Sequence, residues 1–215
     1  MSMQFYAHPL SSYCWKVLIA LYETGAGFEW RQLDWDDAAV QAEFTALWPI
    51  RKMPALVDDG GIVVESSVIV EYLDLHRPGP APLIPRDADA ALRVRLLDRV
   101  FDNYVMTPMQ RIVFDRIRPD GTRNPHDIEQ ARELLDRAYG WLENEIGDVW
   151  AAGDAFGLAD CAAAPSLHYA EKVHPFAGRF PRLGAYLGRL EARPSFARVL
   201  AEAMPYSHMF PQEPT

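Results

Sequence analysis

The sequence predicts a two-part protein in which a small α/β unit precedes an all-helical unit. Three observations predict this class. Strand-like and helix-like segments follow each other over residues 1–77 in the order βαβαββα. A stiff proline-rich joint follows at residues 78–86. Residues 87–215 carry only helix-like patterns, so a mixed unit followed by a helical one is the architecture we expect.

Composition and charge are those of a globular protein with room for a full hydrophobic core. The chain has 215 residues, of which 49% are hydrophobic and 24% are charged. Its net charge of −9, without a basic run, argues against nucleic acid or a membrane as a partner. The sequence shows no signal peptide and no membrane-spanning run, so we expect a cytoplasmic protein. The two cysteines and six histidines lack ligand spacing, and we expect no metal site.

The first strand and the first helix meet at a pair of serines. Residues 3–6 are predicted to form a short strand rich in aromatic side chains. A helix follows, because apolar residues recur at helical spacing until Gly25 stops it; they are Trp15, Leu18, Ile19 and Tyr22. Ser11 and Ser12 therefore lie at the N-terminus of this helix.

The position of this serine pair favours an anion. Free backbone N–H groups and the helix dipole stabilise negative charge, so a thiolate or carboxylate placed against Ser11 would be stabilised. A thiol whose pKa falls by roughly two units from about 8.5 gains about 2.7 kcal/mol for its anion. From these residues alone, the alternative is that Ser11 or Ser12 only caps the helix.

The rest of the α/β unit follows from alternation and turn residues. Further strands are predicted over residues 28–33, 54–57 and 62–64, the last two joined by the tight turn of residues 58–61. A helix is predicted over residues 38–47, and Ser66 and Ser67 are expected to cap the next one. A strand–helix–strand start favours a parallel crossover, and the hairpin adds an antiparallel edge.

The helical unit is predicted from longer apolar periodicities. Residues 87–116 are predicted to form one long helix bent at Pro108. Its expected apolar face consists of Leu92, Leu96, Leu97, Val100, Phe101 and Tyr104. Further helices are expected over residues 128–146, 157–173, 183–192 and 195–203. The helix from Gly157 has few charges and is expected to form the core, with Asp160 reaching back to the backbone of residue 157.

The segment Ser11-Ser12-Tyr13-Cys14-Trp15-Lys16-Val17 carries a family resemblance. It resembles the Ser-Ser-x-x-Trp-(Arg/Lys)-Val run of zeta-class glutathione transferases, which are a serine-type class. Nearly the full chain is similar to a cytosolic glutathione transferase. The resemblance implies a thioredoxin-like N-terminal domain, glutathione as co-substrate and a homodimer. The dimer would form between the N-terminal domain of one subunit and the C-terminal helices of the other.

Two further segments resemble the glutathione-binding motifs of that family. Residues 48–56 resemble Asn-Pro-x-x-Lys-Val-Pro-x-Leu, with Trp48 replacing the asparagine. The resemblance implies a cis Pro54, with Lys52 beside it and the Met53 backbone paired with the cysteinyl main chain of glutathione. Glu65 and Ser66 resemble the acidic-Ser pair that receives the α-ammonium and carboxylate of the γ-glutamyl group. Without the resemblance, Pro54 starts a strand and Glu65 faces solvent.

The implied chemistry is attack by the glutathione thiolate on a small electrophile, with Ser11 donating its hydroxyl hydrogen bond to the sulfur. Three neighbours could take the place of Ser11. Ser12 could exchange roles with it, and is also a candidate glutathione contact. Cys14 could form a mixed disulfide with glutathione, and Tyr6 would act if the protein followed the tyrosine-type classes.

The second substrate is expected between the two domains. Candidate walls are Tyr104, Pro108, Met109 and Ile112, with Tyr206 and Phe210 as lids. Zeta-type members isomerise maleyl acids and need a cation for the carboxylates, for which Arg111 and Lys172 are candidates. A glutathione-dependent isomerase of maleyl acids is therefore one alternative function. A non-catalytic glutathione-fold module for binding or dimerisation is another.

Overall fold

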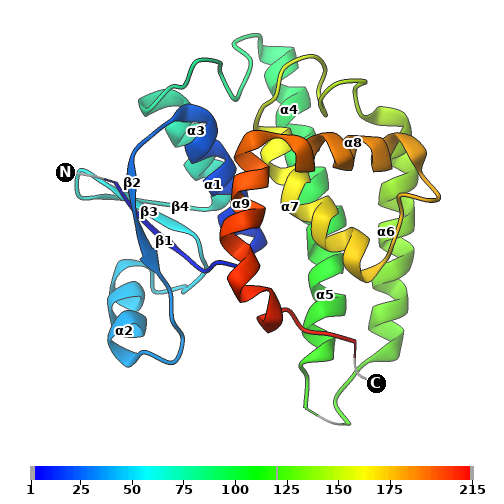
Figure 1. Ribbon diagram of the computed structural model, residues 1–215, viewed down its shortest axis with the longest axis horizontal. Coiled ribbons are helices and arrows are strands. Elements are labelled where there is room, and N and C mark those ends of the chain that lie inside the picture. Colours follow the sequence, from blue (N-terminus) through cyan, green and yellow to red (C-terminus); the bar gives the residue numbers. More distant parts are fainter. Residues whose placement is uncertain (1–2, 120, 214–215) are drawn as a thin grey trace.

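A four-stranded sheet and the helices on its two faces form the N-terminal part of the computed structural model, which describes residues 3–119 and 121–213 (Figure 1). The strand order is β2-β1-β3-β4. Helices α1 and α3 cover one face of the sheet, and α2 covers the other. The elements are β1 (Met3–Ala7), α1 (Ser12–Thr24), β2 (Phe28–Gln32), α2 (Ala38–Leu47), β3 (Ala55–Asp58), β4 (Gly61–Val64) and α3 (Ser66–His76).

The mixed sheet that the turn chemistry predicts is confirmed. β1 and β2 are parallel and are joined through α1, as the crossover requires. β3 is antiparallel to β1, and β4 is antiparallel to β3 through the tight turn at residues 58–61. Helix α1 begins after the N-cap Ser11 and ends at Gly25, whose φ of 70° is the left-handed conformation that glycine adopts without strain.

The prediction that Ser66 and Ser67 cap α3 is wrong. Glu65 occupies the N-cap position, so Ser66 and Ser67 are the first two residues of the helix itself. Within the described residues, the Glu65 side chain makes no capping hydrogen bond. Turn chemistry predicts the helix start to within a residue, but it does not reveal which of three neighbouring polar residues has the non-helical backbone.

The C-terminal part is helical throughout, and the nearly buried α7 runs through its centre (Figure 1). α7 packs against α1 of the N-terminal part as well as against α4 and α5. The elements are α4 (Ala88–Val100), η1 (Phe101–Met106), α5 (Thr107–Arg116), α6 (Pro125–Glu145), α7 (Leu158–Val173), α8 (Pro181–Ala192), α9 (Pro194–Ala203) and η2 (Met204–Met209). Between α3 and α4, residues 77–87 contain neither helix nor strand.

The single long helix expected over residues 87–116 is interrupted by a π-helical turn, η1. Pro108 follows as the second residue of α5. Proline has no N–H to donate, and its ring would clash with the carbonyl four residues earlier in a regular α-helix. The wider π spacing relieves that clash, and the backbone N–H and the hydroxyl of Thr107 both bond to the carbonyl of Asp102.

The predicted apolar face of this region divides into an inner and an outer surface. Leu97 and Phe101 are fully buried, whereas Leu92, Leu96 and Tyr104 are 64%, 48% and 50% exposed. The prediction of a single inner face is therefore wrong for these three residues. The inner face also uses smaller side chains, namely Ala91 and Val94.

The core helix α7 starts at the predicted capping box. Both oxygens of the Asp160 carboxylate are used, since Oδ2 accepts from the Gly157 N–H at 2.9 Å and Oδ1 from the Ala151 N–H at 2.8 Å. Tyr186 donates a third hydrogen bond to this buried carboxylate. Asp160 therefore joins three segments of the helical part, which confirms the structural role predicted for it.

Two negative findings apply to residues 3–119 and 121–213. No helix in these ranges combines the length and the apolar character needed to cross a bilayer. Nor do three or more histidine, cysteine, aspartate or glutamate side chains in these ranges gather in an arrangement that could hold a metal ion.

Candidate active site

Three segments that are distant in the sequence meet at one end of the sheet. Tyr6 of β1 pairs with Ala55 of β3, and Ala55 pairs with Val64 of β4. The turn after β1, Pro54 before β3 and Glu65 after β4 therefore lie at the same end. Both α1 and α3 begin there, so two helix N-termini with free N–H groups belong to this site. Such an end favours a ligand with negative charge.

The backbone of two of these segments has an unusual conformation. The peptide bond between Met53 and Pro54 is cis, as the family resemblance implied. Glu65 has a φ of 69° and a ψ of 116°, a region that residues with a Cβ rarely adopt. A backbone angle pair like that of Glu65 costs about 1–3 kcal/mol and is found mostly where a site requires it. The strained Glu65 is exposed and directly precedes the N–H groups of α3.

The two serines differ in their surroundings. Ser11 is the N-cap of α1, half-buried, and its Oγ accepts a hydrogen bond from the Cys14 N–H at 3.4 Å. Ser12 is 4% exposed, and its Oγ accepts from Gln110 Nε2 of α5 at 3.5 Å. The predicted place of the two serines at the N-terminus of the helix is confirmed, and of the two it is Ser11 that caps it. Because Ser11 is the more accessible hydroxyl, it is the one that a ligand at this helix end reaches more easily.

Cys14 and Tyr6, which the sequence also offers as partners for the sulfur, are placed unfavourably for this chemistry. Cys14 is fully buried, and burial raises the pKa of its thiol to about 12, although hydrogen bonds with Ser11 and His8 offset part of the rise. Tyr6 lies on the face of the sheet that α2 covers, where its hydroxyl donates to Glu43 at 2.7 Å. Burial and this hydrogen bond raise the pKa of Tyr6, so neither group forms an anion readily.

The remaining predicted glutathione contacts surround the cis peptide bond and the start of α3. Lys52 is exposed, Met53 is half-buried and Ser66 is 6% exposed. Trp48, which replaces the family's asparagine, has a buried indole N–H with no hydrogen-bond partner among the described residues. A buried donor without a partner lowers the stability of the folded state, and tryptophan in place of asparagine introduces this donor at the base of the loop.

Known proteins match this chain over both of its parts. A family model described as "Glutathione S-transferase, N-terminal domain" matches residues 5–81, and "Glutathione S-transferase, C-terminal domain" matches residues 125–189. Glutathione S-transferase 3 from Zea mays is 30% identical, covering 93% of each chain. The chain belongs to the glutathione S-transferase family. The predicted fold and the predicted glutathione-dependent activity are thereby confirmed.

Two further members of the glutathione S-transferase family are informative about this chain. Maleylacetoacetate isomerase from Pseudomonas aeruginosa is 30% identical over 210 residues, which cover 90% of this chain and 93% of its own. A crystal structure of a glutathione S-transferase from Methylobacillus flagellatus with glutathione bound matches with a TM-score of 0.84. It is 27% identical and covers 92% of this chain and 98% of its own.

The predicted walls of the second-substrate pocket mostly face the helical core. Pro108 is buried, and Met109 and Ile112 are each 3% exposed among other core side chains. Tyr104 is half exposed, and the exposed Arg111 lies 3.9 Å from Asp127 of α6. The side of α5 that approaches the serine turn is instead the one that carries Gln110 and, one turn earlier, Thr107.

Tyr13 is a neighbour of the serine turn that the sequence did not single out as a site residue. It is half-buried in the first turn of α1, between the two parts of the chain. Burial raises the pKa of its phenol to about 12, the charges of Asp102 and Glu65 add to the rise, and a hydrogen bond with Thr107 offsets part of it. Tyr13 therefore stays protonated and lies within electrostatic reach of Glu65.

A buried ion cluster connects α1 to the helical part, and no pattern in the sequence indicates it. Lys16 is 1% exposed, and its Nζ donates to Asp98, to Asp102 at 2.8 Å and to Ser67 at 2.8 Å. Arg99 closes the cluster from the solvent side by pairing with both carboxylates. Two cations and two anions thus balance, and they fix the helix that carries Ser11 against α3, α4 and η1.

The chain end contacts the serine turn indirectly. Tyr169 of α7 donates a hydrogen bond to the Leu10 carbonyl at 2.9 Å, and Phe210 stacks on Tyr169 with 5.3 Å between ring centroids. Lys172 lies 5.8 Å from the centre of the Tyr169 ring. Phe210 is thus near the turn, as a lid would be. Tyr206 bonds through its hydroxyl to Gln32 at the end of β2, and Gln32 pairs with Ala7, the last residue of β1 before the serine turn.

Proposed function

We propose that this transferase ionises the thiol of glutathione at the N-terminus of α1 and directs the thiolate onto a small electrophile. The proposal rests above all on one observation. The register of the sheet gathers the Ser11 turn, the cis Met53–Pro54 bond and the strained Glu65 at one end. Each feature has an ordinary structural explanation, but a scaffold has no need of all three at one place.

Ser11 is the residue to which we assign the sulfur. Its Oγ accepts a hydrogen bond from the Cys14 N–H, and its hydroxyl hydrogen, which can bond to the Cys14 thiol, can rotate towards the sulfur of a ligand instead. Burial raises the pKa of the neighbouring Cys14 thiol to about 12, so this thiol stays protonated. It therefore does not compete with the glutathione thiolate for the Ser11 hydrogen bond. The backbone N–H groups of the first turn add to the field at the sulfur, and the preorganised donors cost no rearrangement. We accordingly propose a serine-type enzyme.

The rest of glutathione is assigned to the other two segments. The Met53 backbone, turned by the cis bond, would pair with the cysteinyl main chain as an added strand does. Glu65 would hold the α-ammonium, while Ser66 and the first N–H groups of α3 receive the α-carboxylate. Lys52 is exposed next to this segment and can approach a carboxylate of the ligand.

A glutathione-dependent isomerase of maleyl acids is the second candidate. It is supported by the identity of 30% to maleylacetoacetate isomerase from Pseudomonas aeruginosa and by the zeta-like serine segment. A maleyl acid carries extra carboxylates, for which Lys172 near Tyr169 and the exposed Arg111 are the proposed partners. If this candidate is right, Lys172→Met lowers isomerisation of a maleyl acid while leaving turnover of an aryl halide within about twofold.

A paired set of variants tests the main proposal. Ser11→Ala should retain binding to glutathione resin but lower kcat/KM with an aryl halide by about 100-fold at pH 6.5, since one donor to the developing charge is lost. Ser12→Ala is the matched control, and its loss should be much smaller. Binding without turnover in the unmodified protein, or turnover that Ser11→Ala leaves unchanged, would instead favour a binding or dimer module.

We also propose that the enzyme is a homodimer. Leu92 and Leu96 of α4 and Val68 of α3 are large apolar side chains that are 48–64% exposed. These side chains lie on two helices that the Arg95–Glu71 ion pair joins, and exposed apolar side chains are typical of an interaction surface. Light scattering should give a mass near twice 24.3 kDa, and Leu96→Glu should shift it toward one chain.

A further inference from the structure

The peptide group between Leu10 and Ser11 is held by a hydrogen bond at each of its two ends. Its carbonyl oxygen accepts from the Tyr169 hydroxyl at 2.9 Å. Its N–H donates to the His8 carbonyl at 3.1 Å. A peptide group is planar, so it cannot turn about the chain without losing at least one of these bonds. Because this group helps to set the direction in which the Ser11 side chain leaves the backbone, the two bonds restrain the place of the Ser11 hydroxyl.

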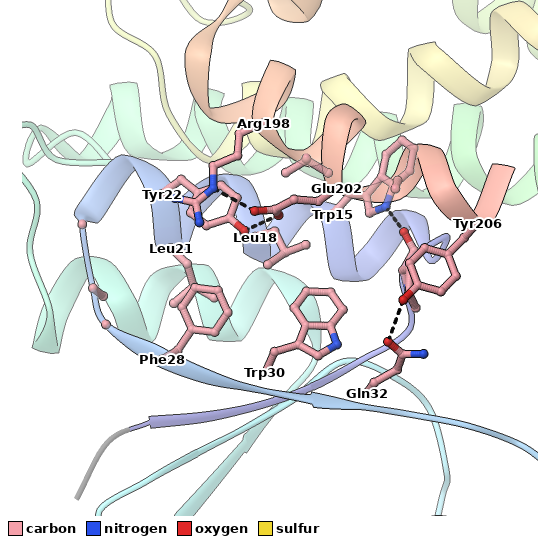
Figure 2. A pocket seen from close by; sticks show the side chains of 16 residues that line it. Trp15, Leu18, Leu21, Tyr22, Phe28, Trp30, Gln32, Arg198, Glu202 and Tyr206 are labelled. Atoms are coloured by element: carbon pink, nitrogen blue, oxygen red, sulfur yellow. Dashed lines mark hydrogen bonds and ion pairs between the residues drawn. The ribbon is translucent and has the colours of Figure 1, made fainter. Parts of the chain in front are cut away.

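The preceding peptide group, between Pro9 and Leu10, is held in the same way. Its carbonyl accepts from the Trp15 indole N–H at 2.6 Å (Figure 2). Its N–H donates to His8 Nδ1 at 3.2 Å. Trp15 and His8 both belong to the N-terminal part of the chain. Among the described residues, only Tyr169 bonds to the backbone of this turn from the helical part.

The Tyr169 ring is packed by two other rings, which leaves its hydroxyl little freedom. The Trp15 ring stacks on it with 4.7 Å between centroids and 27° between planes. The Phe210 ring of the chain end also stacks on it, at 5.3 Å and 9°. Tyr169 is 3% exposed, and burial raises the pKa of its phenol, so the hydroxyl keeps the hydrogen that it donates. A donor fixed in this way needs no rearrangement during the reaction.

The bond within α1 that holds the Ser11 side chain is a long one. The Cys14 N–H reaches Ser11 Oγ at 3.4 Å, whereas N–H···O bonds in proteins usually measure about 2.7–3.2 Å. Such a bond restrains the side chain weakly. The place of the Ser11 hydroxyl therefore depends on the backbone before it, which Tyr169 holds.

We propose that Tyr169 is a positioning residue for the transferase reaction. By holding the Leu10 carbonyl, it keeps the Ser11 hydroxyl aimed at the sulfur of glutathione. The proposal rests on the proposed function, since it requires Ser11 to be the donor to the sulfur. It gives the helical part of the chain a role in ionising the thiol.

Tyr169→Phe is the variant that tests this role, because it removes the hydroxyl and keeps the ring on which Trp15 and Phe210 stack. Tyr139→Phe is the matched control. Tyr139 of α6 is also buried, and its hydroxyl likewise donates to a backbone carbonyl of the helical part, that of His174, at 3.4 Å. Thermal unfolding should show both variants folded.

The expected effect of Tyr169→Phe falls on the chemistry and not on the binding of glutathione. At pH 6.5, kcat/KM with an aryl halide should fall by about tenfold, as expected when a hydrogen bond that aims a catalytic donor is lost. The pKa of the thiol of bound glutathione should rise by about half a unit or more. The Kd for glutathione should stay within about twofold. Tyr139→Phe should leave all three quantities unchanged.

A double variant shows whether Tyr169 acts through Ser11. With Ser11→Ala already present, Tyr169→Phe should lower kcat/KM by less than about twofold, because the hydroxyl that it positions is gone. The proposal is overturned if Tyr169→Phe alone has no effect, if it lowers kcat/KM as much in the double variant as alone, or if Tyr139→Phe has the same effect. A loss of turnover in Ser11→Ala with an unaffected Tyr169→Phe overturns this inference and leaves the proposed function standing. Turnover that Ser11→Ala leaves unchanged overturns both.

Discussion

Replacement of Lys16 by methionine is the sharpest perturbation of the contact between the two parts of the chain. Methionine matches the length of the lysine stem but carries no charge and no donors. The change removes the hydrogen bonds from Nζ to Asp98, Asp102 and Ser67. The two carboxylates, whose side chains are 3% and 6% exposed, then keep Arg99 as their cation, and Arg99 is itself 49% exposed. Asp98 also keeps the hydrogen bond from Ser67 Oγ.

The expected loss is large because it leaves unbalanced charge in the interior. Removing one partner of a buried ion pair costs about 3–5 kcal/mol, and we expect a loss of that size for Lys16→Met at pH 7. Neutralising the stranded carboxylates as well, in Lys16→Met with Asp98→Asn and Asp102→Asn, should recover more than half of it. The comparison separates the charge imbalance from the loss of packing.

The pH dependence of the Lys16→Met loss has a definite sign. Burial raises the pKa of Asp102 above its ordinary value even with Lys16 present, and Lys16 opposes that rise. Without Lys16 the folded-state pKa rises further. A carboxyl group whose pKa is higher in the folded than in the unfolded state binds its proton more tightly when folded, so the variant regains stability as pH falls from 7 towards 5.

Urea unfolding followed by tryptophan fluorescence measures the Lys16→Met loss, and Arg31→Met is the control. Arg31 pairs with Glu29 and Glu43, but all three side chains are 38–48% exposed, so its removal should cost less than about 1 kcal/mol. The reasoning is refuted if Lys16→Met costs no more than Arg31→Met, or if its cost is the same at pH 5 as at pH 7.

Two further predictions concern the cysteines and a second contact between the parts, that of Glu23 with Arg193 and Ser195. Burial raises the pKa of Cys14 to about 12 and that of Cys161 well above its usual range, so a disulfide reagent at pH 8 should react with neither thiol until denaturant is added. A fast-reacting thiol in the native protein would contradict this. Burial opposes the ionisation of Glu23, but hydrogen bonds from Arg193 and Ser195 outweigh it and lower the pKa. Glu23→Gln should therefore cost about 1.5–3 kcal/mol at pH 7 by urea unfolding, and the difference should shrink as pH falls below about 4.5, because a depressed pKa stabilises only above that range. An equal cost at pH 3.5 would argue against the ion pair.

The α/β part could be predicted from the sequence because its signals are local. Ser11 and Gly25 mark the two ends of α1, and the turn at residues 58–61 determines the antiparallel hairpin. The meeting of the serine turn with Pro54 and Glu65 needed the family resemblance, because local patterns do not reveal which strands pair. The backbone at Glu65 was missed, since nothing in residue type distinguishes a strained N-cap from the serines after it.

The contacts between the two parts could not be predicted, because they join residues distant in the sequence. Lys16 is separated from Asp98 by 82 positions, and a lysine on a helix is ordinarily taken for a surface residue. Helical periodicity also does not show which element an apolar helix face packs against. It groups Leu92 with Leu97, although only Leu97 is buried.

The most direct measurement of the central claim is the pKa of the thiol of bound glutathione, followed by the ultraviolet absorbance of the thiolate against pH. In the unmodified enzyme it should lie about two units below the value of about 8.5 for a free thiol. In Ser11→Ala it should rise by at least about one unit, because the remaining N–H groups at the start of α1 stabilise the anion only in part. A bound thiol that titrates like the free one, or a low pKa that survives Ser11→Ala, would contradict the account.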